Sequence, residues 1–221
     1  FLPDATIFET IDFDYETLRK RFREMAFLNK GIKITFKDNR NDKYEEFHYE
    51  GGIKQFVEFI NKSKSSIHDV IYFDGESQGL EVEVAMQYTD GYSENTLSFA
   101  NNIHTPEGGT HLSGFRSALT RTINEYGRSF NIIKENEDNL QGDDVREGLT
   151  ALISIKISDP QFEGQTKSKL GNTEARNAVE SFVNTNLKIF LEENPKSAKT
   201  IVEKAISAQR ARDAARKARD L

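Results

Sequence analysis

A glutamine and a lysine two positions apart, Gln165 and Lys167, are the side chains in this sequence best suited to bind a terminal phosphate. A lysine ammonium is a compact and mobile positive charge, and a glutamine amide can donate hydrogen bonds to phosphate oxygens. Both lie in the polar segment 158–171, between an apolar strand pattern and a helical one. Because lysines in polar loops are usually only solvated, the residues alone leave an ordinary surface loop as the alternative.

A second candidate anion site is the run Gly108-Gly109-Thr110, which precedes a helical pattern. Free N–H groups at the start of a helix can bind an anion. The run lacks the Gly-Lys-Ser/Thr ending of a P-loop, however. We therefore favour a tight turn in which Thr110 caps the helix.

Arginines in two regions are candidates for contact with nucleic acid. Arg116 and Arg121 are five residues apart on the helix that follows Thr110, so they face somewhat different directions. An ordinary surface arginine is the alternative for Arg116. The basic C-terminal run consists of Arg210, Arg212, Arg216, Lys217 and Arg219, against Asp213 and Asp220. This run could flank DNA electrostatically, but its alanine spacing favours first a solvated connector helix.

No complete catalytic centre and no metal site is evident in the sequence. The four histidines show no metal-ligand spacing, and we expect them to serve packing, turns or the surface. These histidines are His48, His68, His104 and His111. No carboxylate lies beside a convincing nucleophile or base. The absence of cysteine excludes disulfides, thiolate nucleophiles and cysteine metal sites.

Composition indicates a well-hydrated globular protein. The 221 residues are 36% hydrophobic and include 16 Phe, which suffices for the core of one large domain. No run approaches the roughly 18 apolar residues of a membrane span, so we expect no membrane partner. The net charge of −6 makes the chain a poor non-specific binder of nucleic acid outside a local basic patch. The lack of cysteine fits a reducing cytoplasm, and the opening Phe1-Leu2-Pro3-Asp4, without methionine or signal pattern, predicts part of a longer protein.

The first quarter of the sequence predicts a helix, a hairpin and a second, shorter helix. Asp14 is a suitable N-cap for the first helix, and Gly31 ends it. Its apolar face consists of Leu18, Phe22 and Met25. Residues 32–36 alternate apolar and polar, and a partner strand runs through residues 47–49. A short amphipathic helix at 53–60 follows.

The middle of the sequence predicts an antiparallel meander. A strand at 71–73 leads to a turn at Asp74-Gly75. Residues 80–88 alternate strictly, which indicates a strand with one face wet. The turn at Asp90-Gly91 leads to a third strand through residues 97–99.

The second half predicts three long helices and one more strand. The first two apolar helix faces are Leu112, Phe115, Leu119, Ile123 and Tyr126, then Val179, Phe182, Val183, Leu187 and Phe190. The polar segment 134–146 predicts a loop or a partly ordered insertion, and residues 151–157 a strand. Pro195 starts the last helix, which we expect to leave the body from Ala208 to Leu221, where its uncharged residues are almost all Ala and Gln. Helices mixed with a mainly antiparallel sheet indicate an α+β fold.

Five segments of the sequence carry a family resemblance. They are Phe47-His48-Tyr49-Glu50-Gly51-Gly52-Ile53; Gly108-Gly109-Thr110-His111 with Gly114-Phe115; Asp144-Val145-Arg146-Glu147-Gly148-Leu149; Pro160-Gln161-Phe162-Glu163-Gly164-Gln165-Thr166-Lys167; and Ala211-Arg212-Asp213-Ala214-Ala215-Arg216-Lys217-Ala218-Arg219. One alone is weak, but all five occur in family order and cover nearly the whole chain. Together they resemble the transducer domains of bacterial type IIA topoisomerase ATPase subunits, those of gyrase B in particular.

This resemblance implies a fold and a domain organisation. The fold is α+β and similar to the second domain of ribosomal protein S5, with a mainly antiparallel sheet, a rare left-handed βαβ crossover and a long C-terminal connector helix. Residues 1–13 resemble the tail of a preceding GHKL-type ATPase domain. Residues 14–194 are then the transducer domain, and 195–221 the connector toward the DNA-cleaving TOPRIM region.

The same resemblance implies the roles of three residues. It places Gln165 and Lys167 on the γ-phosphate of ATP, which the neighbouring ATPase domain holds with Mg²⁺ in the full-length protein. Loss of that phosphate would release the transducer as a rigid body. Arg116 matches an arginine that lines the cavity between two B subunits, where transported double-stranded DNA passes. We expect no nucleotide on this chain alone and no activity from it.

The parent enzyme, with gyrase A and a second copy of gyrase B as partners, would couple ATP turnover to DNA strand passage and negative supercoiling in the bacterial cytoplasm. The equivalent domain of the topoisomerase IV ATPase subunit, which supports decatenation, is the near alternative. The run Asn101-Asn102-Ile103-His104-Thr105 looks more like gyrase B. A stand-alone S5-like module that binds nucleic acid or acts as a scaffold is a second alternative, and it needs a coherent basic face. A self-contained ATPase is disfavoured, since the chain has no Walker A motif.

Overall fold

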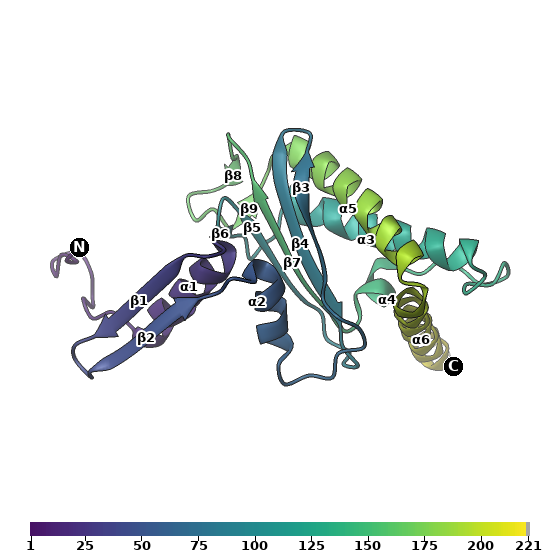
Figure 1. Ribbon diagram of the computed structural model, residues 1–221, viewed down its shortest axis with the longest axis horizontal. Helices are drawn as coiled ribbons and strands as arrows, with labels where there is room; N and C mark the ends of the chain where they lie inside the picture. The colour runs from purple at the N-terminus through teal and green to yellow at the C-terminus, as the bar shows by residue number, and fades with distance from the viewer. Residues whose placement is uncertain (220–221) are drawn as a thin grey trace. The chain divides into compact units, whose positions relative to one another are not determined.

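The computed structural model describes residues 1–219, in two compact units, Phe1–Phe56 and Val57–Leu221 (Figure 1). The last two residues of the expected connector helix, Asp220 and Leu221, lie outside the described part. None of the helices within residues 1–219 is long and apolar enough to cross a membrane. The domain boundaries expected near residues 13 and 194 stay predictions.

The first unit contains one helix, one hairpin and the start of a second helix. The elements are α1 (Tyr15–Leu28), β1 (Lys33–Asp38), β2 (Lys43–His48) and α2 (Gly52–Asn61), and the division between the units falls within α2. Asp14 caps α1 by accepting a 2.8 Å hydrogen bond from the Thr17 amide, as predicted. The expected place of Met25 on the apolar face is wrong, because Met25 is exposed. Phe27 is buried instead, between the rings of Tyr49 and Phe56.

The second unit is built on a five-stranded sheet in the order β3-β4-β7-β5-β6. The strands are β3 (Ile71–Ser77), β4 (Leu80–Tyr88), β5 (Asn95–Ala100), β6 (Ile103–His104) and β7 (Leu149–Lys156). Only β5 and β7 pair in parallel, so the mainly antiparallel α+β fold is confirmed. The expected meander is wrong, because β7 lies between β4 and β5. Its residues 149–155 are all buried, as suits a central strand covered on both faces.

The parallel pair β5 and β7 is joined by a crossover through α3 (Thr110–Ser129) and α4 (Gly142–Arg146). This is the βαβ unit that the resemblance implies, and its left hand stays a prediction.

A glycine explains why the expected turn at Asp74-Gly75 is wrong. Strand β3 continues through both residues, and Gly75 pairs with Val82 of β4. The ring of Phe182 would lie only 3.1 Å from a Cβ at Gly75, so the glycine permits close approach of a helix. The turn lies at residues 78–79, where both φ angles are positive (51° and 81°), as in a tight hairpin.

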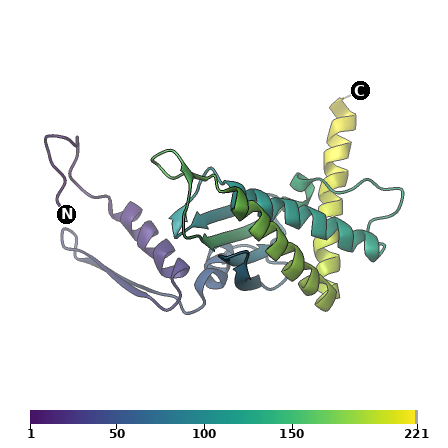
Figure 2. The same cartoon turned by 90° about the horizontal axis from the view of Figure 1, so that it is seen from above.

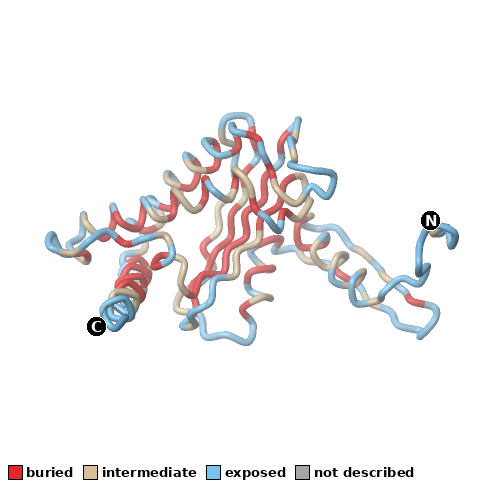
Figure 3. Tube along the Cα trace, turned by 180° about the vertical axis from the view of Figure 1, so that it is seen from behind, coloured by how far each residue is buried: buried red, intermediate tan, exposed pale blue. Residues whose placement is uncertain are grey.

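Two long helices, α3 and α5 (Thr173–Glu193), cover one face of the sheet (Figures 1 and 2). Most of the predicted apolar faces of these helices are buried, with Leu112 and Phe190 only half-buried. The two helices touch at Gly114, where a Cβ would overlap the carbonyl oxygen of Arg176. Burial therefore follows the strands and the helix sides that face them (Figure 3).

The opposite face of the sheet is covered near the end of β4, so the prediction that one face of this strand is exposed to solvent is only partly correct. Ala85 and Gln87 are buried there. The amide of Asn61, at the end of α2, donates to the Gln87 side chain (2.9 Å) and accepts from the Thr150 hydroxyl (2.8 Å). A buried amide pair needs such partners, since an unpaired polar group would cost free energy.

Residues 134–146, here called the strap, contain the predicted loop at 134–141, but they are ordered and pack against the body. Leu140 and Val145 are buried, and the strap ends in the short helix α4. Arg128 of α3 donates hydrogen bonds of 2.6 Å to the carbonyl oxygens of Lys134 and Glu137.

The last helix, α6 (Pro195–Arg219), starts at Pro195 as predicted, and its first half belongs to the core. The expectation that it leaves the body at Ala208 is wrong by about one turn. Ala208 and Gln209 are both buried, because they lie against the rest of the unit next to the strap. Figure 2 shows the remainder of α6 extending away.

We predict that Gly114→Ala destabilises the second unit by about 2 kcal/mol. The higher helix propensity of alanine, worth roughly 1 kcal/mol, is outweighed because the obstructing atom is backbone and the helices must separate. Denaturant unfolding measures the change. The control Glu125→Ala, exposed on the same helix, should stay within about 0.5 kcal/mol of the native chain. A Gly114→Ala variant as stable as the native chain would contradict the close helix contact.

Candidate functional site

The segment that carries Gln165 and Lys167 is a short β-hairpin between β7 and α5, as its predicted place between strand and helix requires. Its strands are β8 (Phe162–Glu163) and β9 (Lys169–Leu170). Gln165, Thr166 and Lys167 form its exposed tip. The structure thus brings the two predicted phosphate ligands together at one end of the second unit.

The tip is a tight turn that presents one free ammonium group. Lys167 has a left-handed φ of 55°, and its amide approaches the Gly164 carbonyl oxygen at 3.3 Å. Its ammonium lies 6.0 Å from the centre of the Phe162 ring. No carboxylate within residues 1–219 pairs with it. Lys169 differs, because its ammonium already pairs with Glu163 at 3.1 Å.

Asn172 fixes the base of the hairpin. This residue is buried at the N-cap of α5, and its side-chain oxygen accepts from the Gln161 amide at 2.6 Å. Its side-chain nitrogen donates to the Asp159 carbonyl at 2.9 Å, and the Gly171 amide donates to Gln161 at 2.7 Å. The hairpin and the first turn of α5 therefore share one hydrogen-bonded base, which no local pattern in the sequence indicated.

The glycine run before α3 forms the second support of the hairpin. The Leu170 amide donates to the Gly108 carbonyl (3.1 Å), and the Glu107 amide donates to Ser168 (3.0 Å). A Cβ at Gly109 would overlap the backbone of Leu170. The predicted tight turn is confirmed, with φ angles of 75° and 136° at the two glycines. The expected cap is wrong: Gly109 is the N-cap, and the hydroxyl of Thr110 makes no capping bond.

His111 packs beneath this turn, as expected of a histidine that serves packing. It is fully buried, and its Nε2 lies 3.2 Å from the Thr105 hydroxyl, which in turn donates to the Ser98 carbonyl (2.9 Å). Burial lowers the pKa of His111 to about 4. The imidazole is therefore neutral near pH 7.

Arg116 belongs to a separate cluster of charges. Its guanidinium donates to Glu94 (2.9 Å), and the other oxygen of Glu94 accepts from Arg146 (3.1 Å). About two fifths of the Arg116 side chain (41%) is exposed. Arg121 pairs instead with Glu180 of α5. These contacts hold α3, α4 and the loop before β5 together, away from the hairpin tip.

The family model and the sequence relatives of this chain agree on one family. Residues 52–221 match the family described as DNA gyrase B. The chain is 56% identical over its whole length to the DNA gyrase B protein of Clostridium acetobutylicum, and it spans 35% of that relative. Among solved structures, the 43K ATPase domain of Thermus thermophilus gyrase B has a TM-score of 0.85 at 41% identity, over 99% of this chain and 59% of that one. The topoisomerase IV ATP-binding domain of Francisella tularensis has a TM-score of 0.80 at 25% identity, over 95% and 57%.

We predict that His111 makes the stability of the second unit depend on pH. The unfolded chain binds a proton as the pH falls below about 6.5, whereas folded His111 excludes it until about pH 4. The free energy of unfolding should therefore fall by up to about 1.4 kcal/mol per pH unit in this window. His111→Gln should flatten the slope between pH 6.5 and 5, although His68, whose pKa burial also lowers, retains part of it. Urea unfolding at several pH values measures the slope in His111→Gln and in the native chain; equal slopes in the two would refute the assignment.

Proposed function

The chain belongs to the DNA gyrase B family, and from this premise we propose that it transmits the state of a bound ATP within an ATP-dependent type IIA DNA topoisomerase. It spans about a third of the length of the curated relatives it matches (35%), so the activity belongs to a longer protein. The observation that carries the proposal is the free Lys167 ammonium at the tip of a braced hairpin.

Gln165 and Lys167 contact the γ-phosphate of ATP. An exposed lysine without a carboxylate partner loses little by binding an anion, because no ion pair has to be broken. The hydrogen bonds of Asn172 and the contact at Gly109 limit the motion of the hairpin, so the backbone that carries the two side chains is already positioned for the phosphate. The neighbouring ATPase domain holds the nucleotide and Mg²⁺, for which this chain contributes only phosphate ligands.

The hairpin is coupled mechanically to the C-terminal helix. Asn172 ties it to the first residues of α5, and only Asn194 separates the end of α5 from the start of α6. The hairpin and the end of α6 lie at opposite ends of the second unit (Figures 1 and 2). When hydrolysis and release remove the phosphate, Lys167 loses its partner and the unit is freed to move as a body.

The partners follow from the same family membership. They are the ATPase domain and TOPRIM region of the same protein, a second copy of gyrase B, gyrase A and double-stranded DNA, in the bacterial cytoplasm. We place Arg116 at the DNA cavity on the family resemblance, and about two fifths of its side chain (41%) is exposed although the guanidinium also bonds Glu94. A stand-alone module that binds nucleic acid is less well supported, because Arg116 and Arg121 are both engaged by carboxylates.

Topoisomerase IV is the second candidate, favoured by the similarity of its solved ATP-binding domain. Identity is higher to the gyrase B sequences (56%) and to the gyrase B structure (41%) than to that domain (25%). Gyrase is therefore the preferred assignment. Supercoiling of relaxed DNA by the reconstituted enzyme supports gyrase, whereas decatenation without supercoiling supports topoisomerase IV.

Lys167→Ala in the full-length protein should lower the rate of ATP hydrolysis by at least about 100-fold. This is the loss expected when a charged group that stabilises the transferred phosphate is removed. The matched control is Lys169→Ala, which removes a lysine two residues away that is already paired with Glu163. A coupled assay of ADP release measures both variants. Normal turnover by Lys167→Ala, with the native unfolding midpoint, would exclude the sensing role.

Arg116→Ala should reduce the salt dependence of DNA binding by the enzyme. Removal of one phosphate contact lowers the slope of log K against log salt concentration by about 1. Glu94→Gln should act in the opposite direction on affinity, since it releases the guanidinium from an ion pair. Arg121→Ala serves as the control. Equal slopes for Arg116→Ala and the native enzyme would place Arg116 outside the DNA path.

A further inference from the structure

The outer half of α6 is held by an ion pair between a partly exposed arginine and a buried carboxylate of the strap. The Arg212 guanidinium donates two parallel hydrogen bonds to Asp144, from Nε to Oδ1 (2.8 Å) and from Nη2 to Oδ2 (3.1 Å). The Asp144 side chain is only 2% exposed. Such a carboxylate is costly without a partner, and a two-pronged arginine contact also fixes direction.

Asp144 is itself held rigidly. Its Oδ2 accepts a 2.8 Å hydrogen bond from the Gln141 amide, which caps α4. The next residue, Val145, is fully buried, and its carbonyl accepts from the Tyr88 hydroxyl of β4 at 2.7 Å. The acceptor for Arg212 therefore belongs to the core of the unit and not to a mobile loop.

A second group of contacts joins α6 to the strap on the same side of the helix. The Gln209 amide donates to the carbonyl oxygens of Asp138 (3.2 Å) and Asn139 (3.3 Å). Asn124 of α3 holds the strap from behind through both backbone groups of Leu140 (2.8 and 3.0 Å). A continuous polar path thus runs from α3 through the strap to α6.

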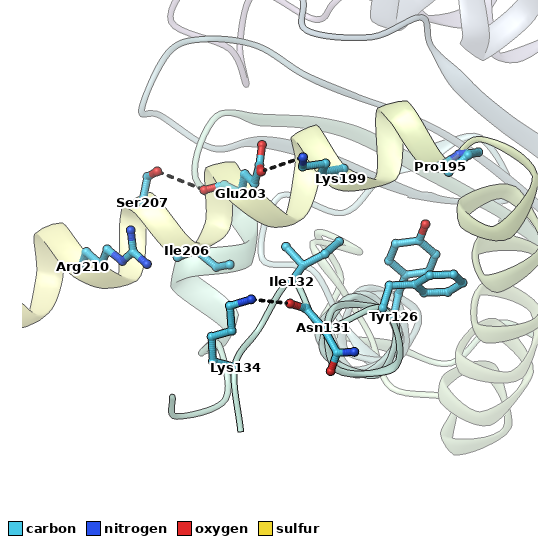
Figure 4. A pocket seen from close by; sticks show the side chains of 11 residues that line it. Tyr126, Asn131, Ile132, Lys134, Pro195, Lys199, Glu203, Ile206, Ser207 and Arg210 are labelled. Atoms are coloured by element: carbon cyan, nitrogen blue, oxygen red, sulfur yellow. Dashed lines mark hydrogen bonds and ion pairs between the residues drawn. The ribbon is translucent and has the colours of Figure 1, made fainter. Parts of the chain in front are cut away.

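Side-chain packing does little to hold α6 along a neighbouring flank. A cavity of about 810 Å³ opens there between α6 and the end of α3 (Figure 4). Its lining includes Tyr126 of α3, Phe130 just after the end of α3, and Lys199, Glu203 and Arg210 of α6. Beyond Gln209, none of the α6 residues up to Arg219 is buried, so the direction of the outer half of α6 depends on the polar contacts with the strap.

We propose that the strap is a latch that fixes the direction in which α6 leaves the second unit, with Asp144 and Arg212 as its positioning residues. The consequence for activity rests on the proposed function. With the latch closed, movement of the hairpin and α5 displaces the far end of α6; with the latch open, α6 bends beyond its last buried turn and the movement is lost. ATP turnover continues in both cases, since the hairpin tip is untouched.

The direction of α6 can be measured in the chain itself. The sequence contains no cysteine, so Glu125→Cys on α3 and Lys217→Cys on α6 give a clean pair of spin-label sites. Pulsed electron paramagnetic resonance should find one narrow distribution of distances between the two spin labels when the rest of the sequence is native. Arg212→Ala and Asp144→Asn should each broaden it, and the double variant should broaden it no further, as for two halves of one contact. Asn at 144 keeps a side-chain oxygen for the Gln141 amide.

The matched control is Arg216→Ala, which removes an exposed arginine one turn further along α6. Its distribution should stay narrow. A narrow distribution in Arg212→Ala, at an unchanged unfolding midpoint, would overturn the latch, as would equal broadening in the control.

The coupling is measured in the full-length protein reconstituted with gyrase A. Arg212→Ala should keep ATP hydrolysis within about twofold of native while the supercoils introduced per ATP fall by about threefold or more, the range of coupling effects in such networks. Equal losses in ATP hydrolysis and in supercoiling would refute the latch. If Arg216→Ala lowered the supercoils introduced per ATP as much as Arg212→Ala does, the effect would come from the positive charge of the C-terminal part of α6, which would also refute the latch. If the native enzyme neither hydrolyses ATP nor supercoils DNA, the proposed function fails, while the distance measurement still decides whether the latch exists.

Discussion

Backbone contact without intervening side chains, at two glycines near the start of α3, is the constraint on which the second unit depends. At Gly114 the backbone of α3 meets the carbonyl of Arg176 in α5, and at Gly109 it meets the backbone of Leu170 in the hairpin. Any larger residue would separate these segments, and packed interiors transmit such displacements instead of absorbing them. The short stretch 109–114, at the start of α3, therefore sets both the spacing of the helix layer and the position of the hairpin tip.

Some basic side chains in the second unit form fixed contacts between its elements, here called the frame, whereas the one at the tip of the hairpin is free. Arginines hold the frame: Arg116 and Arg146 share Glu94, and Arg212 holds Asp144 with two hydrogen bonds. The planar guanidinium suits such fixed contacts, because it orients as well as attracts. The unpaired cation at the tip is a lysine, Lys167, whose flexible stem can follow a mobile ligand.

Local patterns predicted the elements well, while their arrangement depended on contacts that no local pattern contains. The alternation of β4 and the apolar faces of α3 and α5 were readable because periodicity is local. The insertion of β7 beside β5 was not, since it joins residues about fifty positions apart along the chain. Gly75 was misread as a turn because its real neighbour is Phe182. The order of the strap was not predicted, because it depends on backbone carbonyl oxygens of the strap that accept from the side chains of Arg128 in α3 and Gln209 in α6.

The candidate site divides in the same way, and this division explains what it can do. Gln165 and Lys167 were found by residue type together with family resemblance, whereas their supports at Asn172 and Gly109 became visible only in the fold. A ligand shifts a conformational equilibrium only by its difference in affinity for the two states. One lysine–phosphate contact supplies only a small difference in binding free energy between the two states. Little of that free energy can therefore be dissipated between the hairpin and the far end of α6. A stiff connection between the hairpin and α6 meets this condition. It consists of the hydrogen-bonded base of the hairpin, the close packing of α5 on α3 and the contact of α6 with the strap.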